Sequence, residues 1–334
     1  MAILAGIDEA GYGPHLGPLV AAAAALEFAG PDVPEPDLWR PLADFISKHP
    51  PGRGGQMVIC DSKKAYTAGG SLVTLERAVL GFLAAAGLRP RTLAELFQAT
   101  SATALPAAAG DGGACPAAPW ENPEALRLPL QAAQADIDDD AGRLAAGLAR
   151  LGGRPAALRL AAASASRLNR LMTGERNKAA ALFALAADLL AEVLRLGAGG
   201  PVHVTLDRHG GRRYYARLLA GAFPMTAVET LGERADESRY RLRRAADGPR
   251  GNAEVRITVR TRCESSSTAA ALASMAAKYV RELVMRQMNA YFQARVPGLR
   301  PTAGYGLDAW RFLDDIAAAR AALGVPDAAI LRSR

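Results

Sequence analysis

Short apolar runs separated by polar turns predict several β-strands in the first two thirds of the chain. Residues 2–8 and 19–28 flank a turn rich in glycine and proline, so we expect them to pair as a hairpin. Residues 57–61, 155–163 and 201–207 are further apolar runs of strand length. Alanine is a poor strand former, so the second strand of the hairpin is predicted from its turn and its length.

Longer segments carry apolar residues at helical spacing. The pattern is strongest in 177–196, where Leu182, Leu185, Leu189 and Val193 fall on one face. Helices are also expected at 71–87, 131–151, about 212–222, 268–294 and about 307–321. Three more strands are expected at 225–231, 238–244 and 253–262. Because strands and helices alternate, the sequence indicates an α/β fold.

We interpret the 334 residues as a single domain, 1–334, that carries insertions. The insertions are placed at about 30–55, 89–153 and 225–262, and about 265–334 is expected to be a helical C-terminal part. Residues 99–124 are rich in alanine, proline and glycine without a clear period, which predicts a long loop.

Charge and cysteine content narrow the class of protein. The formal charge of +7 and the pI near 9.6 are compatible with a polyanionic partner. Three cysteines without metal-type spacing predict neither a zinc site nor a disulfide framework, which is typical of a cytoplasmic protein. Acids interrupt the apolar N-terminus, and the run at 19–26 is too short to span a bilayer, so we expect neither a signal peptide nor a membrane anchor.

Acidic residues stand at the ends of the predicted strands. Asp8 and Glu9 close the first strand, Asp207 closes another, and Glu264 follows VRITVRTRC. Ligand sites in open α/β sheets lie beyond the carboxyl ends of strands. Two hard cations held by such carboxylates can activate a water molecule and stabilise a leaving oxygen. A lone Asp-Glu pair is more often a solvated turn, but four acids at strand ends favour a metal site.

Six segments, in this order along the chain, resemble the motifs of type 2 ribonuclease H of the ribonuclease H superfamily. They are AGIDEAGYGPHLGPLVAAA (5–23), CDSKKAY (60–66), Leu168-Asn169, VTLD (204–207), ESSSTAAALASMAAKYVRE (264–282) and AGYGLDAWRFL (303–313). The resemblance implies a ribonuclease H-like fold, with a mixed central sheet flanked by helices and a C-terminal helical region.

The resemblance also implies roles for individual residues. Asp8, Glu9, Asp207 and Glu264 would bind two Mg²⁺ or Mn²⁺ ions, with Asp8 between the two. The substrate-binding residues that it implies are Gly11, Tyr12 and Gly13 at the ribose 2′-hydroxyl, Tyr305 on the sugar, and Lys63 and Lys64 at phosphate or beside the acids.

The sequence departs from the family pattern at several of these positions. Tyr12 stands where an arginine is usual, Glu264 replaces an aspartate, and Arg208 follows Asp207 where glycine is usual. The interval from Asp207 to Glu264 is also longer than in compact members. These departures bear on substrate specificity and on metal preference.

The long interval contains arginines at every second position. Arg239, Arg241 and Arg243 alternate with apolar residues, and 253–262 shows the same alternation beyond the sequence DGPRGN. One hypothesis is a two-stranded basic flap that grips phosphates beside the acids. The alternative is the solvated outer face of an edge hairpin.

Together, these features predict a metal-dependent endonuclease that acts on nucleic acid. The resemblance implies cleavage of the RNA strand of RNA–DNA hybrids, or of ribonucleotides embedded in DNA, leaving 5′-phosphate and 3′-hydroxyl ends. The alternatives are action on a different nucleic-acid structure and a non-catalytic nucleic-acid-binding protein. Protein partners are not predicted.

Overall fold

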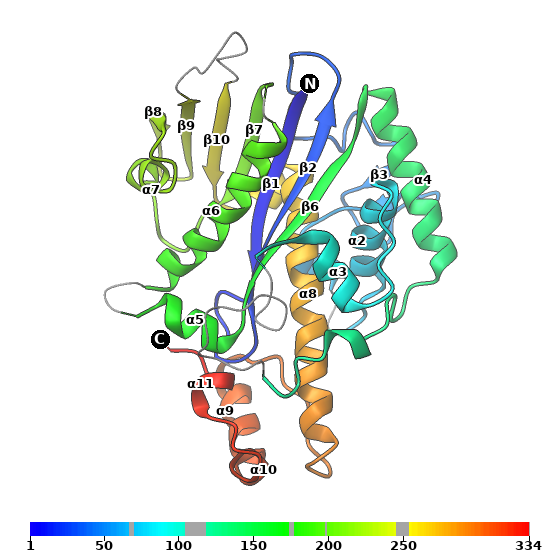
Figure 1. Cartoon of the computed structure of the whole chain (residues 1–334). Coiled ribbons are helices and arrows are strands. Elements are labelled where there is room, and N and C mark those ends of the chain that lie inside the picture. The colour runs from blue at the N-terminus through cyan, green and yellow to red at the C-terminus, as the bar shows by residue number, and fades with distance from the viewer. Residues whose placement is uncertain (67–69, 104–117, 174–176, 198, 245–253, 334) are drawn as a thin grey trace.

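A computed structural model describes the whole chain except residues 67–69, 104–117, 174–176, 198, 245–253 and 334. The centre of the fold is a mixed eight-stranded sheet in the order β5-β6-β2-β1-β7-β10-β9-β8 (Figure 1). The strands β1, β7 and β10 run parallel, whereas β2 pairs antiparallel with both β1 and β6. The expected mixed sheet flanked by helices is confirmed.

The strands of this sheet are β1 (Ala2–Ala10), β2 (Leu19–Phe28), β5 (Ser101–Thr103), β6 (Gly153–Ala163), β7 (Val202–Asp207), β8 (Thr226–Glu233), β9 (Glu237–Arg244) and β10 (Val255–Arg260). A separate two-stranded sheet joins β3 (Ile46–Ser47) to β4 (Met57–Val58).

The α-helices are α1 (Ser62–Ala65), α2 (Val73–Ala85), α3 (Leu93–Thr100), α4 (Gln134–Arg150), α5 (Ala165–Leu171), α6 (Lys178–Leu196), α7 (Ala216–Ala222), α8 (Thr268–Gln293), α9 (Gly306–Asp315), α10 (Ala317–Ala322) and α11 (Asp327–Ile330). Two short 3₁₀ turns are η1 (Pro123–Ala125) and η2 (Cys263–Ser265).

Helices cover both faces of the sheet around β1 and β2. Helix α6 packs on one face, and α8, backed by α2, packs on the other (Figure 1). Strand β2 is buried along its whole length although it consists largely of alanine. Alanine side chains let both helices approach the strand closely, so packing overrides the low strand propensity of this residue.

Side-chain caps fix where the helices begin. Asn177 accepts a hydrogen bond from the amide of Ala180 at the start of α6, and Ser267 accepts one from Ala270 at the start of α8. The cap at Ser267 sets the position of the turn just before it, which contains Glu264. In the part of the chain that the structure describes, no helix has the length and hydropathy needed to cross a membrane.

Three sequence expectations need correction. Residues 99–124 are not wholly a loop, because α3 extends to Thr100 and β5 adds a strand at the sheet edge. The run at 57–61 gives only the short β4, which lies outside the central sheet. The two strands of the expected basic hairpin, β9 and β10, do pair antiparallel, but they belong to the central sheet, because β10 also pairs in parallel with β7. The expected turn DGPRGN (247–252) lies outside the described residues.

Candidate metal and nucleic-acid site

Parallel pairing of β1 with β7 brings two of the predicted acids together. Asp8 and Glu9 lie within the last residues of β1, and Asp207 is the last residue of β7. The register pairs Ile7 with Leu206. Asp8 and Asp207 are the next residues on the two strands, so they lie at the same edge of the sheet. The sequence expectation of a shared strand end is thus met for these three acids.

Glu264 reaches the same edge because α8 lies unusually close to β1. A β-carbon on Gly6 would come 2.0 Å from the backbone nitrogen of Ala270, so only glycine fits under the first turn of the helix. The η2 turn directly precedes that helix and carries Glu264. The amide of Cys263 in the same turn donates to Asp207 Oδ1 at 3.3 Å.

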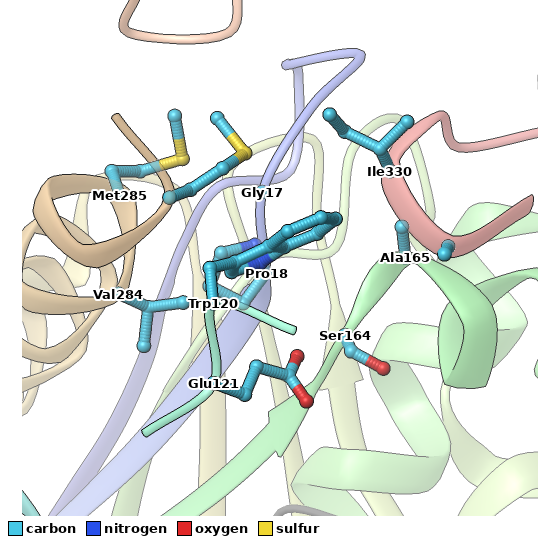
Figure 2. A pocket seen from close by; sticks show the side chains of 11 residues that line it. Gly17, Pro18, Trp120, Glu121, Ser164, Ala165, Val284, Met285 and Ile330 are labelled. Carbon is cyan, nitrogen blue, oxygen red and sulfur yellow. The ribbon is translucent and has the colours of Figure 1, made fainter. Parts of the chain in front are cut away.

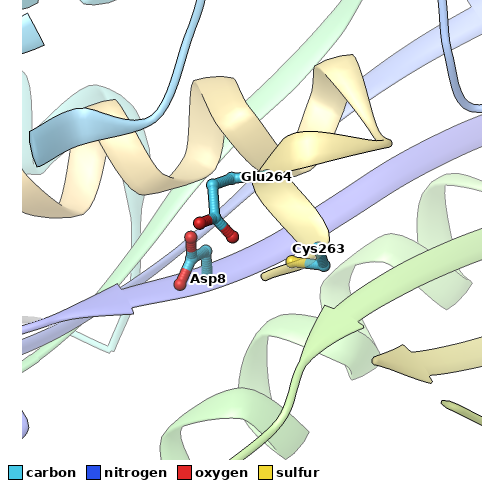
Figure 3. Close-up of side chains that lie close together, drawn as sticks. All are labelled: Asp8, Cys263 and Glu264. Atoms are coloured by element: carbon cyan, nitrogen blue, oxygen red, sulfur yellow. The ribbon is translucent and has the colours of Figure 1, made fainter. Parts of the chain in front are cut away.

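The four acids form two overlapping groups that share Asp8. In one group, carboxylate oxygens of Asp8, Glu9 and Asp207 all lie within 4.8 Å of one another. In the other, a carboxylate oxygen of Asp8, one of Glu264 and the sulfur of Cys263 lie within the same distance (Figure 3). Spacing of this order is what oxygen ligands around hard divalent cations require.

Burial and mutual repulsion make these carboxyl groups hard to ionise. Burial, followed by the charges of Glu9 and Asp207, holds the pKa of Asp8 well above its ordinary value. Burial and the Asp207 charge raise the pKa of Glu9 to about 8. Burial also raises the pKa of Asp207 and of Glu264. Positive charge between these groups would relieve the repulsion, so the donor set fits divalent cations.

The glycine turn that follows β1 lies beside Tyr305. Gly11 has a φ of +89°, and a β-carbon there would meet the carbonyl oxygen of Pro18 at 2.5 Å. A β-carbon on Gly13 would lie 3.8 Å from the ring of Tyr305, whose side chain is 47% exposed. The structure therefore brings Gly11, Tyr12, Gly13 and Tyr305 to one place beside the acids.

Lys63 and Lys64 have different neighbours. Lys63 is exposed, and its charge partly offsets the rise that burial causes in the pKa of Glu9 and of Glu264. Lys64 acts instead on the Cys60 thiol. Asp61 joins neither acidic group, since its side chain caps α1 by accepting from the amide of Lys63 at 2.8 Å.

A buried arginine near the C-terminus holds the glycine turn in place. Arg332 is 3% exposed, and its guanidinium donates to the carbonyl oxygens of Gly11, Pro14 and Gly17. Its backbone amide donates to the carbonyl oxygen of His15 at 3.0 Å. A residue more than 300 positions away in the sequence thus supports the glycine turn. By the family resemblance, this is the turn that would contact the sugar.

A small cavity of about 20 Å³ lies behind the same turn. Figure 2 shows Gly17 and Pro18 on one side of it, with Trp120, Met285 and Ile330 around them. This volume suffices for about one water molecule and excludes a substrate. The cavity is therefore part of the packing that supports the turn.

The arginines of β9 and β10 are matched by glutamates. We call Arg239, Arg241, Arg256 and Arg260 the sheet-face arginines, because they line one groove of about 560 Å³ on the face of β7, β10 and β9. Each contacts Glu229, Glu237 or Glu254 within 4.0 Å. Arg243 also pairs with Glu229, at 3.5 Å. The predicted alternation is confirmed, but the charges are largely neutralised on the protein itself.

The sequence interpretation missed three features of the site. Cys263 lies among the acids, Arg332 supports the glycine turn, and the loop after Asp207 carries Arg212, whose charge acts on Tyr12. For the loop, the signal was present, because Arg208 stands where glycine is usual in the resembled family. No signal in the sequence joins Arg332 to a turn at the opposite end of the chain.

Comparison with known proteins identifies similar structures only. No family model and no curated protein matches the sequence. RNase HII of Archaeoglobus fulgidus, solved with PCNA, has a TM-score of 0.44 and 15% identity over 99% of this chain and 94% of its own. Ribonuclease H2 of Pyrococcus horikoshii OT3 has a TM-score of 0.39 and 12% identity over 98% and 92%.

Bst-RNase HIII, solved with Mn²⁺, has a TM-score of 0.41 and 15% identity over 99% of this chain and 66% of its own. With each TM-score below 0.5, the likeness carries no argument about the site, which is interpreted from its own residues and geometry. These three solved structures are type 2 ribonucleases H, the family that the motifs of this chain resemble.

Proposed function

We propose that the protein is a metal-dependent endonuclease that hydrolyses the RNA strand of RNA–DNA hybrids, or ribonucleotides embedded in DNA. The observation that carries the proposal is the pair of overlapping acidic groups that share Asp8. Two divalent cations, Mg²⁺ or Mn²⁺, would supply activation of water and stabilisation of the leaving oxygen at a phosphodiester. The products would be 5′-phosphate and 3′-hydroxyl ends.

In this proposal the residues of the chain hold the cations and orient the substrate. Asp8 would help to hold both cations, together with Glu9 and Asp207 for one and with Glu264 for the other. The backbone of the glycine turn and the exposed ring of Tyr305 would contact the sugar at the cut, where the 2′-hydroxyl distinguishes RNA from DNA. Lys63 adds positive charge at the rim of the acids.

The test is cleavage of three labelled duplexes: RNA–DNA, DNA with one ribonucleotide, and all-DNA, with Mg²⁺ and then Mn²⁺. We expect metal-dependent cutting of the first two. Asp8→Asn should lower the cleavage rate by more than about 100-fold. Removing a residue that only hydrogen-bonds to a metal ligand already costs up to about 100-fold, and Asp8 would be a ligand itself. Asp44→Asn is the matched control, because Asp44 is an exposed aspartate that pairs with Arg150 of α4, and its replacement should keep the rate.

Tyr12 favours a second candidate, in which the same site cuts a different nucleic-acid structure. Its hydroxyl lies 3.1 Å from where a β-carbon on Gly210 would be, and Lys178 lies 5.9 Å from its ring centroid. An aromatic ring here offers a stacking surface where the resembled family has a charge. Cutting of branched or single-stranded substrates in preference to hybrids would favour this candidate. Tight binding without metal-dependent cutting of any substrate would contradict both.

A further inference from the structure

Two sets of arginines lie near the acids, and only one of them forms ion pairs with glutamates of the protein. The sheet-face arginines each contact a glutamate. In the loop that follows Asp207, Arg208, Arg212 and Arg213 have no ion pair with any residue that the structure describes. We call these three residues the loop arginines. Their charge remains available to an anionic ligand.

The loop is fixed on one side against the neighbouring strand ends. The amide of Arg208 donates to the carbonyl of Arg260 at 3.2 Å, and its Nη1 donates to the carbonyl of Ala235 at 2.5 Å. The carbonyl of Arg213 accepts from Ser238 Oγ at 2.9 Å. The loop arginines therefore sit on a supported backbone rather than on a free tip.

On its other side the loop faces the acids and the glycine turn. Gly210 lies against the hydroxyl of Tyr12. Burial and the charge of Glu9 raise the pKa of that hydroxyl, and the nearby charge of Arg212 offsets part of the rise. Asp207 directly precedes Arg208. The loop therefore borders the acids on the side of the glycine turn.

Several guanidinium nitrogens of the loop lack acceptors. Nε and Nη2 of Arg208 and Nε of Arg212 are buried without a hydrogen-bond partner. Buried donors ordinarily have a partner, and leaving one unsatisfied is costly. Phosphate oxygens are suited to the role, because a guanidinium can donate two parallel hydrogen bonds to them.

We infer that Arg208, Arg212 and Arg213 form a phosphate-binding loop for the sugar–phosphate backbone beside the cut, in place of the basic flap. The inference rests on the proposed function, since it takes nucleic acid as the ligand. The contact is to the backbone, so it positions any duplex without reading its sequence. Gly210, with a φ of +57°, and Gly211 leave room for the backbone to approach.

The test measures binding of labelled RNA–DNA and all-DNA duplexes over a salt series, in an Asp8→Asn background that prevents cutting. Arg212→Gln/Arg213→Gln should flatten the slope of log affinity against log salt by about two units, because each arginine neutralises one phosphate. Arg212→Lys should bind less tightly than the wild type but more tightly than the double glutamine variant. Lysine keeps the charge but cannot donate two parallel hydrogen bonds. Arg208→Gln is a further variant, checked by its melting temperature because Arg208 also contacts Ala235.

The charge-matched control is Arg154→Gln/Arg195→Gln. Arg154 pairs in register with Glu27 near the start of β1, and Arg195 is in the last turn of α6, so both lie at the opposite end of the sheet from Asp8. We expect the control to keep the wild-type slope. Equal slopes for the loop variants and the control would overturn the inference. Because cutting by the wild-type protein is scored separately, such a result would leave the proposed function standing, whereas absence of cutting would not.

Discussion

The backbones of Gly6 in β1 and Ala270 in α8 are in contact, and this contact determines how closely the start of α8 approaches the strand. A β-carbon on Gly6 would lie 2.0 Å from the Ala270 nitrogen and 2.4 Å from the Ala269 carbonyl carbon. The helix cannot yield locally, since its backbone is hydrogen-bonded and capped by Ser267. The position of Glu264 relative to Asp8 therefore depends on the absence of one methyl group.

Replacement of Gly6 by alanine should destabilise the protein and weaken metal binding together. Overpacking of a dense interior costs about 1–3 kcal/mol, and the displaced helix would carry Glu264 away from Asp8. Urea unfolding and Mn²⁺ titration measure the two effects. Gly142→Ala is the control, because it lies in α4 with open space around it and should stabilise the helix by up to about 1 kcal/mol. Unchanged metal affinity in Gly6→Ala would contradict the role of this contact.

Stability of the metal-free protein should fall as the pH rises through the titration of Glu9. Its pKa rises from 4.5 to about 8 on folding, so between these values the folded form holds a proton that the unfolded form releases. Glu9→Gln should therefore be more stable than the wild type near pH 8 and similar to it below pH 4.5. Urea midpoints in the presence of a chelator measure the difference. If Glu9→Gln were more stable than the wild type by the same amount at every pH, the raised pKa of Glu9 would not be the cause.

The fully buried Glu76 should be among the most destabilising positions to truncate. Its carboxylate accepts from the amides of Leu130, Gln131 and Ala132 at 2.6, 2.7 and 2.8 Å, and from the hydroxyl of Tyr279 at 3.0 Å. Glu76→Ala leaves these donors without an acceptor, each at about 1–3 kcal/mol. We expect a loss of about 3 kcal/mol or more in urea unfolding.

The control for Glu76 is a glutamate on the surface. Glu229→Ala removes an exposed partner of Arg241 and Arg243 and should cost less than about 1 kcal/mol. A comparable loss in both variants would mean that Glu76 does not anchor the segment at 130–132.

Arg332→Met should loosen the glycine turn. The guanidinium donates to three carbonyl oxygens of the turn, and a hydrogen bond from a charged donor contributes about 1.5–3 kcal/mol. We expect a loss of at least about 1.5 kcal/mol in urea unfolding and faster amide hydrogen exchange in residues 11–17. Arg320→Gln breaks an ion pair with the exposed Asp327 in the same C-terminal region. It should leave exchange in the turn unchanged, and equal exchange in both variants would refute the support by Arg332.

The sequence alone locates the acids well because strand ends are visible in it. Asp8 and Asp207 close apolar runs, and parallel strands bring such ends to one edge. The neutralisation of the sheet-face arginines could not be predicted, because alternation marks one face of a strand and not the residues opposite it. Arg241 meets Glu229 and Glu254 only once β8, β9 and β10 have paired. The strand β5 was missed for a related reason. It has three residues and exists by pairing with β6, not by its own pattern.

The separation of Glu264 from Asp8 along the chain has a consequence for biosynthesis. A nascent polypeptide that has not yet reached Glu264 holds at most three of the four carboxylates and lacks the helix that packs over Gly6. The set of four carboxylates therefore cannot assemble before Glu264, in a chain of 334 residues, has been translated. The acids can therefore hold cations as a complete set only late in synthesis, after the segment that carries η2 and α8 has left the ribosome.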